Sequence, residues 1–99
     1  MIIKEVKEKL ESSNHPIAKS LHQGKGFKVL VIGFKKGMVL KEHKAPLSSK
    51  LTVLEGNIVY KEETRTIELN RYDEVDIPVD ILHSVEAYKD SLCILTQGE

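Results

Sequence analysis

The sequence predicts an all-β domain, a sandwich or barrel of short antiparallel strands, preceded by a short N-terminal helix. Two observations carry this prediction. From Phe27 onward, short runs of β-branched and other apolar residues alternate with turn residues. The chain has only 99 residues, which leaves room for one hydrophobic core. Many short strands in so small a chain favour a sandwich or barrel. We therefore expect a single domain over residues 1–99, with the β-barrel at 27–97.

Residues 1–13 are predicted to form the helix or arm. Ile2, Val6 and Leu10 recur at four-residue spacing, while Lys and Glu fill the other faces. So short a helix is marginal by itself in water. Its apolar stripe should therefore pack either on its own barrel or on a neighbouring chain.

The remaining chain divides into strands separated by turns. Glycines lie at several of these turns, where they accept positive φ without steric cost. The predicted strands are 27–35, 38–43, 50–55, 57–62, 65–69, 75–77, 82–88 and 91–97.

Two of these strands are apolar on both faces. In Phe27–Phe34 both the odd and the even positions carry large apolar side chains, and Leu92–Leu95 behaves in the same way. A small barrel has one interior, so a second buried surface is expected, formed by the N-terminal helix or by another subunit. We expect a homodimer.

Charge and cysteine content narrow the class of protein. Fifteen Lys and Arg balance fifteen Asp and Glu, so no basic excess favours nucleic acid or a membrane surface as partner. The one cysteine, Cys93, lies in an apolar run, where a buried thiol in a reducing compartment is expected. Residues 1–12 lack the apolar stretch of a signal peptide. We expect a cytoplasmic protein.

His43 and His83 are the residues most suited to chemistry, because each lies at the edge of a predicted strand. Imidazole is a common ligand of Zn, Fe, Ni and Cu. The alternative is that both rings simply line the barrel and are hydrogen-bonded there. Spacing alone leaves both interpretations open.

The segment Gly37–Ala87 resembles the cupins, and in particular their small single-domain members. Gly37, His43 and Gly56 match the first cupin motif at its spacing, and Pro78 and His83 match the second. Ala45 and Ser49 stand where that first motif has its second His and its Glu. Tyr72 and Asp80 stand where the second motif has its two glycines, and Ala87 stands where it has its Asn, so both motifs are degenerate.

The resemblance implies a jelly-roll barrel, a double-stranded β-helix, whose motif histidines point inward. In metal-binding cupins three histidines and a glutamate hold one divalent ion. Carried over by position, only His43 and His83 remain as candidate metal ligands, so the expected cofactor is either none or one divalent transition metal (Zn, Fe, Ni or Mn). The candidate ligand-binding residues are His43, Ser49, Leu51, Val53, His83 and Val85.

Three functions follow as hypotheses, and the sequence identifies no catalytic residue. The first is a small-molecule-binding or sensing cupin with a degenerate metal site, in which an apolar barrel holds a ligand near the two histidines. The second is a metal-dependent oxygenase or isomerase with an incomplete ligand set. The third is a structural dimer without a guest, whose barrel interior is filled by side chains.

Overall fold

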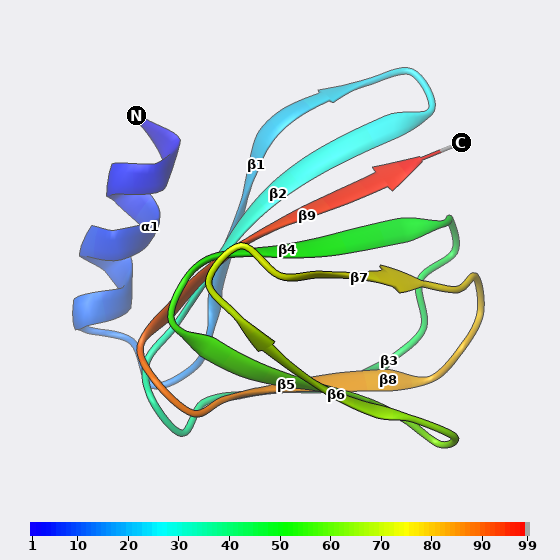
Figure 1. Ribbon diagram of the computed structural model, residues 1–99. Coiled ribbons are helices and arrows are strands. Elements are labelled where there is room, and N and C mark those ends of the chain that lie inside the picture. The colour runs from blue at the N-terminus through cyan, green and yellow to red at the C-terminus, as the bar shows by residue number, and fades with distance from the viewer. Residues whose placement is uncertain (99) are drawn as a thin grey trace.

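The computed structural model describes residues 1–98 and shows two antiparallel sheets that enclose one core (Figure 1). The five-stranded sheet has the order β1 (Ile17–Gly24), β2 (Phe27–Phe34), β9 (Ser91–Gly98), β4 (Ser49–Glu55), β7 (Glu74–Ile77). The four-stranded sheet has the order β3 (Val39–His43), β8 (His83–Ala87), β5 (Asn57–Glu62), β6 (Thr66–Asn70). From β2 onward, every connection except the β5–β6 hairpin crosses from one sheet to the other, and the predicted all-β fold is confirmed.

The core lies between the inner faces of the two sheets. Phe34, Val53, Ile58 and Tyr60 each have an exposed fraction of 0% and belong to one apolar cluster. Cys93 is buried in the same cluster, where burial raises the pKa of its thiol to about 12. The thiol is therefore a small packed side chain, as its apolar sequence context predicts.

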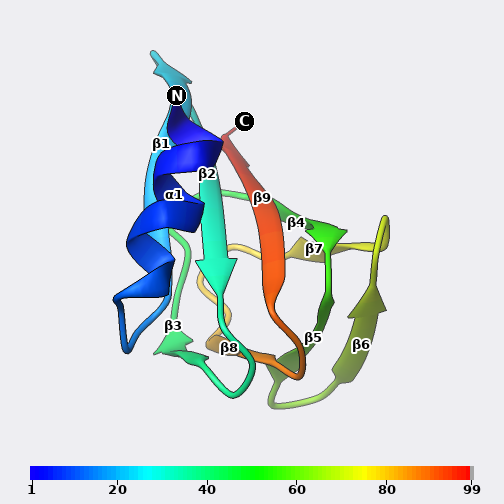
Figure 2. The same ribbon diagram turned by 90° about the vertical axis from the view of Figure 1, so that its left-hand side faces the viewer.

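The helix α1 (Ile2–Glu11) covers the outer face of the five-stranded sheet, against β1 and β2 (Figure 2). Val6, which is fully buried, forms a second apolar cluster with Val31 and Leu92. A Cβ built on Gly33 would lie 2.9 Å from Cγ1 of Val6, so only glycine lets the helix approach this closely. The helix is thus the second buried surface that the doubly apolar strands require. The homodimer stays a prediction.

Strand β1 corrects the predicted start of the barrel, because it pairs with β2 from residue 17 and the barrel does not begin at 27. The strand lies at the sheet edge and is mostly exposed, so it carries little apolar alternation. A bulge between Ser20 and His22 disturbs what alternation there is. No helix within residues 1–98 is long and apolar enough to cross a membrane.

Candidate binding site at the barrel mouth

The site lies at one end of the barrel, which we call the mouth: the end at which β3 finishes with His43 and β8 begins with His83. The loops at 44–48 and 78–82 and the hairpin between β5 and β6 lie at the same end, on the right of Figure 1. His43 is exposed, whereas His83 has an exposed fraction of only 3%.

A bulge in β3 brings the two histidines together. Leu40 pairs with Val85, and the next pair of inward-facing residues is His43 with His83. Between these two pairs β3 contains one residue more than β8 does. Simple alternation would have placed His43 on the face opposite Leu40. The bulge instead places both rings on one face, with centroids 4.2 Å apart.

Backbone hydrogen bonds fix the tautomer of both rings. Nδ1 of His43 lies 2.9 Å from the carbonyl oxygen of Lys41, and Nδ1 of His83 lies 3.0 Å from that of Ile81. A carbonyl oxygen only accepts hydrogen bonds, so Nδ1 carries the hydrogen in each ring. The Nε2 atom of a neutral ring then keeps its lone pair, the arrangement found in histidines that bind metals or accept hydrogen bonds from ligands.

The environment of His83 keeps its ring neutral at neutral pH. Burial lowers the pKa of His83, and the nearby His43 lowers it further, against the raising effects of the Ile81 carbonyl and of Glu62. The ring stacks on Tyr60, with centroids 5.6 Å apart. Three rings in contact therefore lead from the surface into the core, a ladder of side chains made by His43, His83 and Tyr60.

A polar cluster that sequence reasoning missed borders this ladder: Tyr60, Glu62 and Arg65. The hydroxyl of Tyr60 donates to Oε2 of Glu62, which also accepts from Nη2 of Arg65 at 2.7 Å. The guanidinium holds the pKa of Glu62 below its usual range, and burial together with that carboxylate raises the pKa of Tyr60. Glu62 pairs with His83 across β5 and β8, so only the strand register, absent from sequence reasoning, could have found it.

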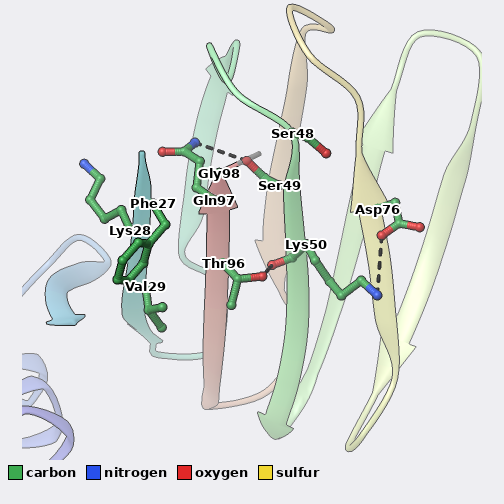
Figure 3. A pocket seen from close by; sticks show the side chains of 10 residues that line it. All are labelled: Phe27, Lys28, Val29, Ser48, Ser49, Lys50, Asp76, Thr96, Gln97 and Gly98. Carbon is green, nitrogen blue, oxygen red and sulfur yellow. Dashed lines mark hydrogen bonds and ion pairs between the residues drawn. The ribbon is translucent and has the colours of Figure 1, made fainter. Parts of the chain in front are cut away.

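Ser49 occupies the mouth end of a different pocket. Its hydroxyl donates to the Leu47 carbonyl and accepts from Nε2 of Gln97. Figure 3 shows it beside Lys50, whose Nζ reaches Asp76 at 3.7 Å. This pocket, of about 320 Å³, is not lined by either histidine. The structure therefore gives Ser49 hydrogen-bond partners of its own, away from the histidine pair.

Leu51, Val53 and Val85 point into the barrel but do not border open space. Their exposed fractions are 2%, 0% and 3%, which leaves almost no surface that a water molecule could touch. They belong to the close-packed cluster that also contains Phe34 and Tyr60. A ligand that reached them would have to displace a core side chain, so their role as ligand contacts stays a prediction.

The donor set at the mouth does not fit a complete metal centre. Within residues 1–98, no three His, Cys, Asp or Glu side chains are arranged to hold one ion. Ala45 is buried and supplies no donor atom, and the Ser49 hydroxyl is engaged as described. A structural or catalytic zinc takes three or four protein ligands, and here two imidazoles are available.

Comparison with known proteins identifies the fold. No family model matches the chain, and no curated protein matches it. Among solved structures, a cupin superfamily protein from Desulfitobacterium hafniense superposes with a TM-score of 0.81 at 16% identity, over 87% of this chain and 79% of that one. A cupin 2 conserved barrel domain protein from Leptotrichia buccalis reaches 0.80 at 25% identity, over 89% of this chain and 43% of that one.

A third structure is named KdgF, from Halomonas, and has a TM-score of 0.77 at 20% identity, over 89% of this chain and 84% of that one. Together with the two facing sheets, these likenesses show that the chain has the cupin fold.

Proposed function

We propose that this protein binds a small molecule at the barrel mouth and acts as a binding or sensing module, with His43 and His83 in contact with the guest. The observation that carries the proposal is the pair of rings whose Nδ1 atoms donate to backbone carbonyls. In its neutral form each ring has one unshared lone pair, on Nε2, and the exposed His43 makes the pair accessible from solvent.

The chemistry of the pair favours a guest that carries hydrogen-bond donors. A neutral imidazole with hydrogen on Nδ1 offers an acceptor at Nε2, and the lowered pKa of His83 keeps that ring neutral. Glu62, beside His83, adds a carboxylate. Hydroxyl, amide and amine groups satisfy such acceptors, whereas a carboxylate does not.

A screen of melting temperature against a metabolite collection tests the proposal. A guest that binds only the folded protein raises the melting temperature by mass action. The shift should appear in the wild type and in a control variant, His22→Ala, which removes an exposed histidine of β1. It should disappear in His43→Ala. A stable protein that no compound shifts would favour the structural dimer without a guest, and a shift retained in His43→Ala would mean that the guest binds away from the histidine pair.

The second candidate is a metal-dependent enzyme, and the fixed Nδ1 hydrogens favour it because they prepare both Nε2 atoms for one divalent ion. A protein described as the DMSP lyase DddQ from Ruegeria pomeroyi shares the fold with a TM-score of 0.80 at 14% identity, over 90% of this chain and 49% of that one. Elemental analysis of untagged protein, purified without chelator, separates the candidates. Near-stoichiometric metal that is lost in His43→Ala would support the enzyme. Metal-free protein, even after incubation with Zn, Ni, Mn and Fe(II), would exclude it.

A further inference from the structure

A row of three hydrogen-bond acceptors crosses the mouth on the inner face of the four-stranded sheet. His43 pairs with His83 across β3 and β8, and Glu62 pairs with His83 across β5 and β8. Residues directly opposite each other on paired strands point to the same face, with Cβ atoms roughly 4.5–5.5 Å apart. One small group of a guest can therefore contact neighbouring members of the row.

Each member of the row has one polar atom that no other residue engages. In Glu62, Oε2 accepts from Tyr60 and Arg65, whereas Oε1 has no hydrogen-bond partner within residues 1–98. The same holds for Nε2 of both histidines, whose Nδ1 atoms donate to the backbone. Over the same residues, no side-chain nitrogen or oxygen is both buried and without a partner. Oε1 of Glu62 and Nε2 of His83 therefore border space that a guest can reach, although both side chains are largely buried.

Arg65 holds the carboxylate of Glu62 in place. Its Nη2 donates to Oε2 of Glu62 at 2.7 Å and to the carbonyl oxygen of Asp76, in β7 of the other sheet, also at 2.7 Å. The guanidinium lowers the pKa of Glu62, so the carboxylate stays ionised and accepts hydrogen bonds without donating any. The charge of Arg65 is balanced by that of Glu62. The mouth therefore discriminates between guests by their hydrogen-bond donors rather than by their net charge.

We infer that the guest at the mouth is a primary amine, whose ammonium group donates to Oε1 of Glu62 and to Nε2 of His83 and His43; this inference rests on the proposed function. An ammonium group has three N–H donors and no acceptor, so it matches three acceptors without setting one lone pair against another. A hydroxyl group offers one donor, and a quaternary ammonium or a carboxylate offers none. The bond to the ionised carboxylate is also of the stronger, charge-assisted kind.

Four probes with the same alkyl chain test the class of guest: butylammonium, butan-1-ol, butyltrimethylammonium and butyrate. Each is titrated into isotope-labelled wild-type protein with a chelator present, at about pH 7.5, where an alkylamine is protonated. The titration runs to about 100 mM, since so small a probe is expected to bind with a dissociation constant on the order of 1 mM or weaker. Butylammonium should move the ring signals of His43 and His83, with a dissociation constant about tenfold or more below those of the other probes.

The variant Glu62→Gln tests the role of the carboxylate, and Glu63→Gln is the matched control. Both variants change the net charge equally, but Glu63 is an exposed residue of the hairpin outside the row. Because Gln replaces one acceptor oxygen by an N–H donor, Glu62→Gln should weaken the binding of butylammonium about tenfold or more and that of butan-1-ol much less. Glu63→Gln should bind both probes as the wild type does. Far-UV circular dichroism checks that both variants fold, and the comparison of the four probes needs the wild type alone.

The outcomes separate this inference from the proposed function. If butan-1-ol or butyrate moves the two rings as readily as butylammonium does, the mouth binds a guest that is not an amine, and only the inference is overturned. If no probe moves either ring, the amine is excluded, and the melting-temperature screen decides the proposed function separately. Butylammonium that moves only signals away from the two rings would count against both. Equal weakening in Glu62→Gln and Glu63→Gln would also overturn the inference.

Discussion

The buried ring of His83 makes the stability of the protein depend on pH. Burial lowers the pKa of His83 below its ordinary value of 6.5, so the folded protein takes up this proton less readily than the unfolded chain. Above pH 6.5 both states are neutral at this residue. Below it the unfolded chain gains a proton first, so the free energy of unfolding falls as the pH falls, until His83 also protonates in the folded state.

We therefore expect His83→Gln to lose less stability than the wild type between pH 7 and pH 5. Urea unfolding with a chelator present measures how steeply the free energy of unfolding falls with pH in each protein. His22→Gln, which changes an exposed histidine outside the mouth, should keep the wild-type slope. An equally steep loss in His83→Gln would show that the ring is not buried as described.

Two residues with positive φ occupy positions that are glycine in the cupin motifs. Tyr72 has φ 74° and Asp80 has φ 58°, so the backbone of the motif is kept although its glycines are not. Asp tolerates this left-handed region better than Tyr, whose Cβ is crowded there. The sequence resemblance located both positions, and the backbone explains why the family has glycine at them.

Tyr72→Gly should raise the free energy of unfolding by about 1 kcal/mol, because it removes a left-handed conformation that costs roughly 1–2 kcal/mol and adds some chain entropy to the unfolded state. Tyr72 is 69% exposed, so little packing is lost. Tyr88→Gly is the comparison, since Tyr88 is 47% exposed and is not among the residues with positive φ. It should be destabilising. Urea unfolding of both variants checks this, and equal destabilisation would contradict the argument.

Among the secondary-structure elements, sequence periodicity predicted the helix and eight strands. The structure differs from this prediction where the alternation of apolar and polar residues gives no signal. Strand β1 was missed because it is an exposed edge strand with a bulge. The turn at Gly24 and Gly26, directly before β2, was the available indication of a hairpin. The bulge in β3 had no such indication, and it decides that His43 faces inward.

The contact between α1 and β2 can be tested by a double-mutant cycle. Gly33→Ala should cost about 1–3 kcal/mol, because the added Cβ would lie 2.9 Å from Cγ1 of Val6 and 3.3 Å from Cδ2 of Leu10. Val6→Ala removes the atom that is met first. The double variant should therefore lose less stability in urea than the sum of the single losses.

Losses that add to within about 0.3–0.5 kcal/mol would mean that the two residues do not touch. Two ion pairs also connect the helix to the barrel, Glu5 with Lys19 and Lys7 with Glu55. Both pairs are substantially exposed, so they contribute little to stability. The apolar contact with Gly33 is thus the sensitive probe of where the helix lies.

At the scale of the whole molecule, the degenerate motifs were sufficient for the fold but not for the site. Gly37, His43, Gly56, Pro78 and His83, in order and at the family's spacing, predicted the barrel that the structure shows. The site depends on neighbours brought in by strand register, namely the cluster around Glu62, which no spacing rule reveals. A packed interior likewise depends on how side chains from both sheets interlock.

Nitrogen spectra of the four histidine rings test whether the histidine pair at the mouth is the binding site. Isotope-labelled, metal-free protein should show hydrogen on Nδ1 of both His43 and His83. Compounds that raise the melting temperature, or Zn²⁺, should shift the ring signals of these two residues and leave those of His15 and His22 unchanged. Bound guests that leave the signals of His43 and His83 in place, while backbone signals elsewhere move, would contradict binding at the histidine pair.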